Sequence, residues 1–202
     1  IMLDVSTMDK YDTQKMYKIY DKWPEIARES FESNQESVNF ENIDHIVFAG
    51  MGGSGSIGDV FSSILSKNDI HVSLVKGYLL PKTVDKNTLV VVTSVSGNTL
   101  ETLTVLDSAR KMDCNLIAFS SGGKMEKMCK DYQILFRKIP FFHSPRTSLI
   151  NFTYSILNIL NSILPIEKKD IVESLNNLDI IKKQISFQNL TDSNPAINLS
   201  RW

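Results

Sequence analysis

The chain has 202 residues, with 22 Lys and Arg against 23 Asp and Glu, so its formal net charge is −1. Hydrophobic residues make up 42% and charged residues 22%, which excludes a disordered tail, a collagen-like repeat and a disulfide scaffold. The near-zero charge lacks the basic footprint of a nucleic-acid binder, so no nucleic-acid partner is expected. The two cysteines, Cys114 and Cys129, belong to no Cys/His cluster, so neither a metal site nor a disulfide framework is expected.

Targeting and membrane segments are not indicated either. Asp4 and Ser6 bring acidic and polar character too early for a secretory signal peptide. The uncharged stretch 147–166 contains three asparagines as well as Ser and Thr residues, which is too polar for a lipid-facing span. We therefore expect a cytoplasmic protein without a membrane partner.

Along the chain, residues 11–31 predict an N-terminal helical region interrupted at Trp23-Pro24. Short apolar runs then predict strands at 46–49, 72–75, 89–93 and 115–119, with a weaker fifth at 133–136, and helices between them at 56–66, 99–112 and 124–130. This alternation is typical of an α/β fold with a doubly wound, five-stranded parallel sheet flanked by helices. We assign that domain to residues 42–165, after an N-terminal helical segment, 1–41.

The segment after Pro145 combines apolar stripes with an uncharged polar stripe made of Asn151, Ser155, Asn158 and Ser162. A contact with another domain or subunit would explain this stripe, and so would a buried core helix with a slim exposed edge. Residues 167–185 predict an amphipathic helix, and Asn194-Pro195 is a helix-start signal. Because few residues follow that signal, we expect 166–202 to include the start of a connector to a second domain.

The first candidate for chemistry is the glycine-rich segment 50–56, directly after the first predicted strand. Glycines at a helix start let backbone N–H groups approach a phosphate. The segment also fits the dinucleotide pattern GxGxxG, but the region 75–78 lacks the carboxylate that a nicotinamide site requires. A capping box formed by Ser56 and Asp59 would explain those two residues without any ligand.

The second candidate follows the third predicted strand, where Ser94, Ser96 and Thr99 bracket a glycine. Hydroxyls and backbone amides at a helix start form a metal-free nest of donors for a phosphate monoester. Here too a capping box, Asn98 with Glu101, is the alternative. Two such junctions on one parallel sheet point to its carboxyl edge, where ligands of open α/β sheets bind.

Four segments occur in the order seen in the sugar isomerase (SIS) domain: Gly50–Ser54, Ser94–Thr102, Ser121–Lys124 and Pro145–Leu149. Together they resemble the bifunctional phosphoglucose/phosphomannose isomerase family, and the last segment narrows the match to it. Lys15-Met16 and Trp23-Pro24 loosely resemble the opening helix of that family. The resemblance implies an αβα sandwich that binds a sugar phosphate and uses no cofactor.

The resemblance also implies residue roles. Ser94, Ser96 and Thr99 would hold the substrate phosphate, Gly53 and Ser54 would contact the sugar near the reacting carbons, and Arg146 would be the catalytic residue that stabilises the enediolate, with an ordinary surface arginine as the alternative. The family places its base carboxylate, its ring-opening histidine and a late lysine in a second SIS domain. The local histidines, His45, His71 and His143, are poor substitutes for these groups, and only His143 is placed so that it could approach the site.

From this resemblance we expect the N-terminal half of an aldose–ketose isomerase, interconverting glucose 6-phosphate or mannose 6-phosphate and fructose 6-phosphate and inactive alone. The expected partners are the sugar phosphate and a second SIS domain or a homodimeric copy. A non-catalytic sugar-phosphate sensor and a single-domain isomerase completed across a dimer remain the alternatives.

Overall fold

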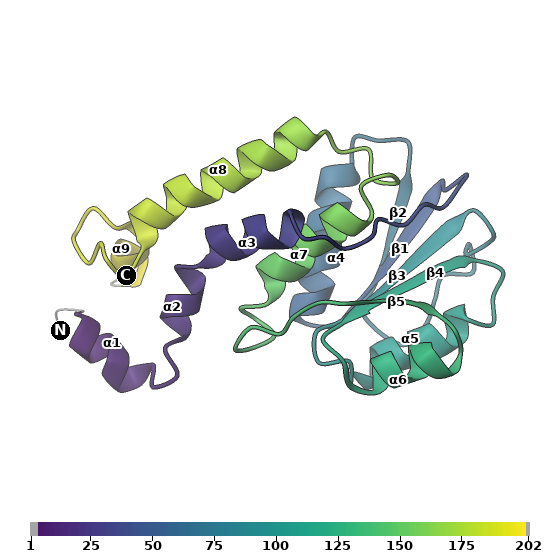
Figure 1. The fold of residues 1–202 in the computed structure, drawn as a ribbon, viewed down its shortest axis with the longest axis horizontal. Coiled ribbons are helices and arrows are strands. Elements are labelled where there is room, and N and C mark those ends of the chain that lie inside the picture. Colours follow the sequence, from purple (N-terminus) through teal and green to yellow (C-terminus); the bar gives the residue numbers. More distant parts are fainter. Residues whose placement is uncertain (1–3, 201–202) are drawn as a thin grey trace.

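A five-stranded parallel sheet forms the centre of the computed structural model, which describes residues 4–200 (Figure 1). Its strands are β1 (His45–Ala49), β2 (His71–Val75), β3 (Thr88–Ser94), β4 (Asn115–Ser120) and β5 (Leu135–Lys138). They lie in the order β2-β1-β3-β4-β5, and every neighbouring pair is parallel. All residues of β1 and β3 are buried, as continuous apolar strands covered on both faces should be. The predicted fold class is confirmed.

Helices cover both faces of the sheet (Figure 1). On one side lie α4 (Gly53–Leu65) and α7 (Leu149–Ile159), and on the other α5 (Leu100–Ala109) and α6 (Gly123–Asp131). Because strand side chains alternate, Ile46 and Phe48 join the core under α4 and α7, whereas Val47 and Ala49 join the core under α5 and α6. This packing fixes where each helix begins relative to the sheet.

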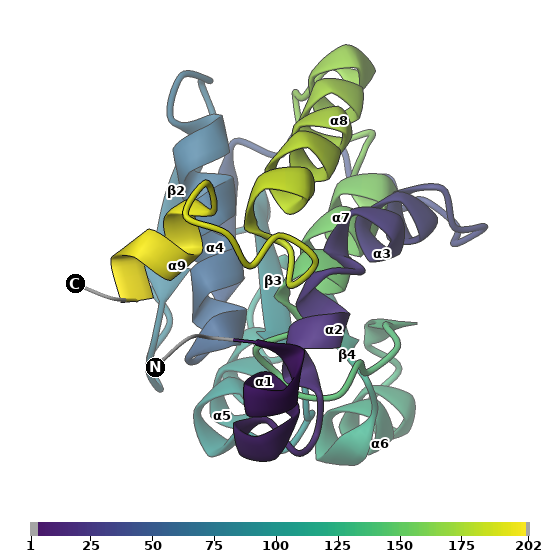
Figure 2. The same ribbon diagram turned by 90° about the vertical axis from the view of Figure 1, so that its left-hand side faces the viewer.

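Outside these layers, further helices build on α7 (Figure 2). α3 (Trp23–Phe31) packs on α7, α8 (Lys168–Ile185) packs on α3, and α9 (Pro195–Ser200) packs against α8. The first two helices are α1 (Val5–Tyr11) and α2 (Met16–Tyr20). The side chain of Asn194 accepts a hydrogen bond from the N–H of Ala196 (2.8 Å), so the predicted helix start at Asn194-Pro195 is confirmed. Within residues 4–200, none of the helices combines the length and apolar character that a bilayer crossing requires.

The predicted interruption of the N-terminal helical region at Trp23-Pro24 is confirmed, because α2 ends at Tyr20 and α3 begins at Trp23 with proline in its first turn. Two other predicted boundaries are wrong. The fifth strand begins at Leu135 rather than at residue 133, because Gln133 has a left-handed backbone (φ 55°) and the N–H of Ile134 returns to the Cys129 carbonyl. α4 begins at Gly53 rather than at Ser56, so the glycine-rich segment is itself the first helical turn.

The polar stripe of α7 is covered by the chain's own N-terminal part. Asn158 donates to the Ser33 carbonyl (3.0 Å), and the Ser162 hydroxyl, just beyond α7, donates to the Val38 carbonyl (2.7 Å). Asn151 is fully buried and donates to the Pro140 carbonyl (2.7 Å). The buried-helix interpretation is therefore correct, and the stripe satisfies backbone carbonyls of passing loops.

Candidate functional site

The carboxyl ends of β1, β3 and β4 lie at one edge of the sheet, and each leads into a helix. The register pairs Ala49 with Val92 and Ser94 with Ser120, so these three strands finish close to one another. The helix after β1, α4, lies on one face, whereas the helix after β3, α5, lies on the other. This reversal is a topological switch point, the place where open α/β sheets bind ligands.

Ser54 ties the two turns at the switch point together. Its side chain is buried (9% exposed), and its Oγ accepts a hydrogen bond from the N–H of Val95 at 3.2 Å. The bond joins the first turn of α4 to the loop after β3, 41 residues further along the chain. The geometry of one turn therefore depends directly on the other.

The β3–α5 turn holds the three hydroxyls predicted to bind phosphate. Ser94 is buried, and its Oγ accepts from the N–H of Gly97 (3.1 Å) and donates to Oγ1 of Thr99 (3.2 Å). Ser96 is exposed, and Thr99 is partly exposed. Thr99 is the N-cap residue of α5, yet within the described chain its side chain makes no capping hydrogen bond. The first-turn N–H groups of α5 thus lack a side-chain acceptor from Thr99, and their partial positive charge favours an anion at the sheet edge.

The β4–α6 turn packs against this one so closely that glycine is required. Gly97 has φ +67°, and a Cβ there would lie 1.8 Å from the Gly122 carbonyl oxygen. The side chain of Asn98 accepts from the N–H of Lys124 (3.1 Å) and donates to the Ser96 carbonyl (3.1 Å). Asn98 therefore serves the start of α6 rather than its own helix.

Both predicted capping boxes are wrong. Ser56 lies inside α4 and its N-cap position is occupied by Gly52, so Ser56 and Asp59 cannot form the box. Asp59 instead pairs with Lys76, with 2.6 Å between Oδ2 and Nζ. For α5, the N-cap is Thr99 rather than Asn98, which displaces the expected box by one residue.

Arg146 lies on a loop whose neighbouring hydroxyls are turned inward. Thr147 and Ser148 are fully buried, and both hydroxyls donate to the Phe142 carbonyl, at 2.6 and 3.2 Å. Arg146 itself is exposed, and within residues 4–200 its guanidinium has no ion-pair or hydrogen-bond partner. A fixed loop thus presents an uncompensated cation to solvent.

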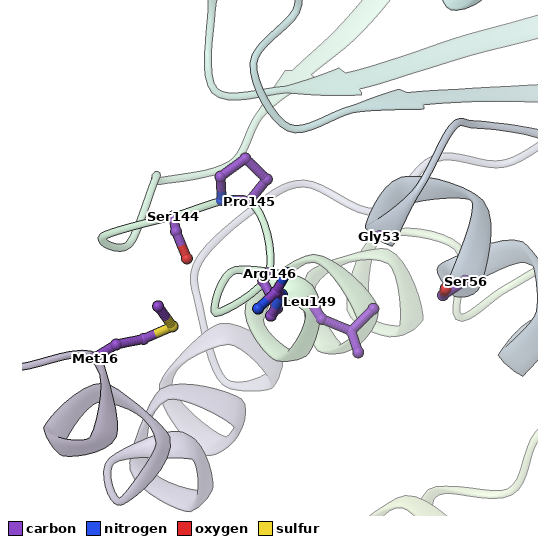
Figure 3. A pocket seen from close by; sticks show the side chains of 7 residues that line it. All are labelled: Met16, Gly53, Ser56, Ser144, Pro145, Arg146 and Leu149. Atoms are coloured by element: carbon purple, nitrogen blue, oxygen red, sulfur yellow. The ribbon is translucent and has the colours of Figure 1, made fainter. Parts of the chain in front are cut away.

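A cavity of about 640 Å³ lies between this loop and the start of α4 (Figure 3). Its volume is typical of a small-molecule site. The residues lining it are Met16, Gly53, Ser56, Ser144, Pro145, Arg146 and Leu149. In Figure 3, Met16 lies on one side of Arg146, and Gly53 and Ser56 lie on the other. No Asp, Glu or His of the described chain lines this cavity, so the cavity offers one cation, two hydroxyls and apolar walls.

The structure brings two of the predicted site residues to the cavity itself. Gly53 and Arg146 line it, and Ser54 lies beside Gly53 with its hydroxyl directed at the adjoining turn. Ser94, Ser96 and Thr99 form that adjoining turn and are not among the cavity residues.

Sequence reasoning gave no binding role to four other lining residues. Met16, Ser56 and Leu149 belong to segments singled out by their sequence, whereas Ser144 lies just before the Pro145–Leu149 segment and was missed. His143 is not among the residues that line the cavity, and its Nε2 lies 3.0 Å from the Gln14 carbonyl oxygen.

Comparison with known proteins decides the family. A family model described as the SIS domain matches residues 39–160. The chain belongs to the SIS domain family. It is 34% identical over 158 residues to the bifunctional phosphoglucose/phosphomannose isomerase of Thermoplasma acidophilum, covering 78% of this chain and 47% of that protein. The enzyme of the same description from Thermoplasma volcanium is 37% identical, over 69% of this chain and 43% of its own length.

The SIS chain thus spans about half the length of the curated relatives it matches, and the resemblance noted in its sequence is confirmed. Among solved structures, a hypothetical protein from Thermus thermophilus superposes with a TM-score of 0.61 at 16% identity. The match covers 98% of this chain and 48% of the other. At that identity the superposition supports the fold alone.

Proposed function

We propose that this SIS chain is the sugar-phosphate-binding half of an aldose–ketose isomerase, interconverting glucose 6-phosphate or mannose 6-phosphate and fructose 6-phosphate. The observation that carries the proposal is the switch point, where the Ser54–Val95 hydrogen bond joins an open helix start to the hydroxyl-lined β3–α5 turn, beside a cavity holding the unpaired Arg146. The similarity to bifunctional phosphoglucose/phosphomannose isomerases supports the choice of substrate class.

In this proposal the phosphate binds at the β3–α5 turn. Ser96 and Thr99 offer hydroxyls at the surface, Ser94 holds Thr99 in place from below, and the first amides of α5 add N–H donors. The site requires no metal for this, since hydroxyls, amides and the helix start together supply donors for a dianion. The sugar carbons would then extend toward Gly53 and Arg146.

Isomerisation moves the proton at C2 of the open-chain aldose to C1, while a hydroxyl proton passes from O2 to O1 through a cis-enediol. Arg146 would stabilise the negative charge that develops on the enediolate oxygens, because a fixed guanidinium is most effective in a water-poor cleft. The proton transfer also requires a base within hydrogen-bond reach of C2. Because no carboxylate or imidazole of the described chain lines the cavity, we assign the base to a second SIS domain or a second copy.

We further propose that the complete enzyme works in the cytoplasm, in the hexose phosphate interconversion shared by glycolysis and gluconeogenesis. Both cysteines, Cys114 and Cys129, are free thiols, and burial raises the pKa of the Cys129 thiol to about 11. A buried, protonated thiol of this kind is compatible with a reducing compartment.

Calorimetric titration tests the binding function. The chain should bind fructose 6-phosphate but not fructose, because most of the recognition is directed at the phosphate. Ser96→Ala should weaken binding, whereas Ser66→Ala, which alters an exposed hydroxyl that donates to the nearby Ser63 carbonyl, should leave it unchanged. Equal affinity for fructose and its phosphate, or no binding of either, would refute the proposal.

A further inference from the structure

The N-terminal segment forms hydrogen bonds to the Arg146 loop before and after Arg146. The indole Nε1 of Trp23 donates to the Thr147 carbonyl at 3.0 Å, one residue after Arg146. On the other side, Nε2 of His143 lies 3.0 Å from the Gln14 carbonyl, so the imidazole must be the donor there. We call residues 14–23 the N-terminal brace. Its two bonds join parts of the chain that are 124 and 129 residues apart in sequence.

The brace and the loop both carry unusual backbone conformations where they meet. Lys15 has φ 57° and His143 has φ 54°, in the left-handed region that non-glycine residues seldom adopt. Such conformations persist when surrounding contacts over-determine them, and they concentrate at functional sites. Both conformations lie at the contact between His143 and Gln14, since Lys15 directly follows Gln14.

Trp23 is itself held in a fixed orientation. Its ring packs edge-on against Tyr20, with 4.9 Å between centroids, and the next residue, Pro24, is buried in the first turn of α3. The indole N–H is thus directed at the loop before any ligand arrives. A donor arranged in this way limits the movement of the backbone that carries Arg146.

The same brace contributes a wall of the cavity. Met16, the first residue of α2, lines the cavity opposite Gly53 and Ser56 (Figure 3). One short segment therefore supplies an apolar wall of the cavity and fixes the loop that bears Arg146. Among the described residues that line the cavity, Arg146 is the only cation.

We propose that Trp23 is a positioning residue for Arg146, and that the N-terminal brace completes the sugar-phosphate site of this domain. The proposal rests on the proposed function, because it takes Arg146 to contact the ligand. Preorganising the guanidinium removes the entropy cost of ordering its loop on binding, so losing the indole donor lowers affinity.

Trp23→Phe tests the proposal by removing the donor while keeping an aromatic ring against Tyr20. The matched control is Ser162→Ala, which deletes a side-chain bond to the Val38 carbonyl (2.7 Å) that also spans 124 residues. This bond lies beyond the C-terminal end of α7, whereas Arg146 precedes the N-terminal end of that helix. In calorimetric titrations with fructose 6-phosphate, Trp23→Phe should bind about three- to tenfold more weakly than the wild type. Ser162→Ala should stay within about twofold.

A double-mutant cycle separates positioning from general destabilisation. If Trp23 acts through Arg146, Trp23→Phe should cause no further loss of affinity in an Arg146→Ala background. If Trp23→Phe lowers the affinity by about the same three- to tenfold in the wild-type and Arg146→Ala backgrounds, the proposal is overturned.

A second readout needs no ligand. Limited trypsin digestion should cleave after Arg146 several-fold faster in Trp23→Phe than in the wild type, and at the wild-type rate in Ser162→Ala, because only the first variant frees the loop.

His143→Asn provides a milder variant, since asparagine tolerates the left-handed backbone but lacks the reach to Gln14, and it should also speed this cleavage. If the wild-type chain fails to bind fructose 6-phosphate, the proposed function is wrong. The digestion rates alone then test whether the N-terminal brace holds the Arg146 loop. Equal cleavage in Trp23→Phe and Ser162→Ala would overturn it.

Discussion

Replacing Ser54 with alanine removes a side-chain oxygen that joins the α4 and β3–α5 turns of the candidate site. In the native chain this oxygen accepts the N–H of Val95, a residue that is 2% exposed. Alanine leaves that N–H without its acceptor in an environment closed to water. The substitution removes very little volume, so the lost hydrogen bond dominates the effect.

The expected cost follows from two opposing contributions. A buried backbone donor without a partner costs about 1–3 kcal/mol. Alanine has a better helix propensity than serine, which returns roughly 0.5 kcal/mol because Ser54 lies in the first turn of α4. The free energy of unfolding should therefore fall by about 0.5–2.5 kcal/mol. For a chain of this length, that corresponds to a melting temperature lower by roughly 1–10 °C.

Thermal and urea denaturation followed by circular dichroism measure this loss. Ser56→Ala is the matched control, because it makes the same substitution two residues later, at an exposed position of α4. Ser56→Ala should change the free energy of unfolding by less than about 0.5 kcal/mol. If both variants are equally stable, the Ser54–Val95 bond does not join the two turns in solution, and the reasoning about the switch point is wrong.

Three further predictions concern binding, catalysis and pH. Ser94→Ala should weaken fructose 6-phosphate binding about three- to tenfold, because it removes the hydrogen bond that holds the Thr99 hydroxyl in place. An unchanged titration curve would remove Ser94 from the site. The chain as a monomer should bind the ligand yet show essentially no isomerase turnover, so steady turnover by a pure monomeric sample would contradict the assignment of the base to another domain or copy. Burial and the neighbouring His71 lower the pKa of His45 below its ordinary 6.5. Below about pH 6.5 the His45 imidazole therefore binds a proton more readily in the unfolded chain than in the folded one, so the free energy of unfolding should fall as the pH drops. His45→Gln should flatten this dependence between pH 7.5 and 5.5, and equal slopes would exclude His45 as its source.

The strands were predictable because burial on both faces leaves a clear record in the sequence. The run from Leu89 to Thr93 contains only apolar or β-branched residues, and every residue of β3 is buried. The weak fifth run failed at its start because a left-handed residue, Gln133, ends the preceding turn there. Single-residue backbone conformations of this kind have no periodic signal.

The order of the strands, and hence the switch point, could not be read from the sequence. The same alternation of strands and helices fits several sheet orders, and only packing places β3 beside β1. The inward direction of Ser54 depends on that order, since its partner Val95 follows β3. The glycine and hydroxyl motifs were found, but the way in which they hold one another in place was not.

Helix caps were misjudged for a related reason. Capping-box spacing is a local rule, whereas Asn98 serves the N-terminus of a different helix by bonding to the N–H of Lys124. Likewise, the uncharged polar stripe of α7 suggested a partner as readily as a core, because a sequence does not reveal that the segment near Ser33 and Val38 supplies the carbonyls. Contacts between residues so distant in sequence can be identified only from the three-dimensional structure.

The central claim is that the β3–α5 turn holds the phosphate of a phosphorylated hexose. An NMR titration of the ¹⁵N-labelled chain with fructose 6-phosphate tests it residue by residue. We predict that the largest amide shifts fall within residues 96–102, at the exposed hydroxyls and the first turn of α5, with smaller shifts at Gly53 and Arg146. Shifts confined to the opposite edge of the sheet, such as those at His45 and His71, where β1 and β2 begin, would contradict the account.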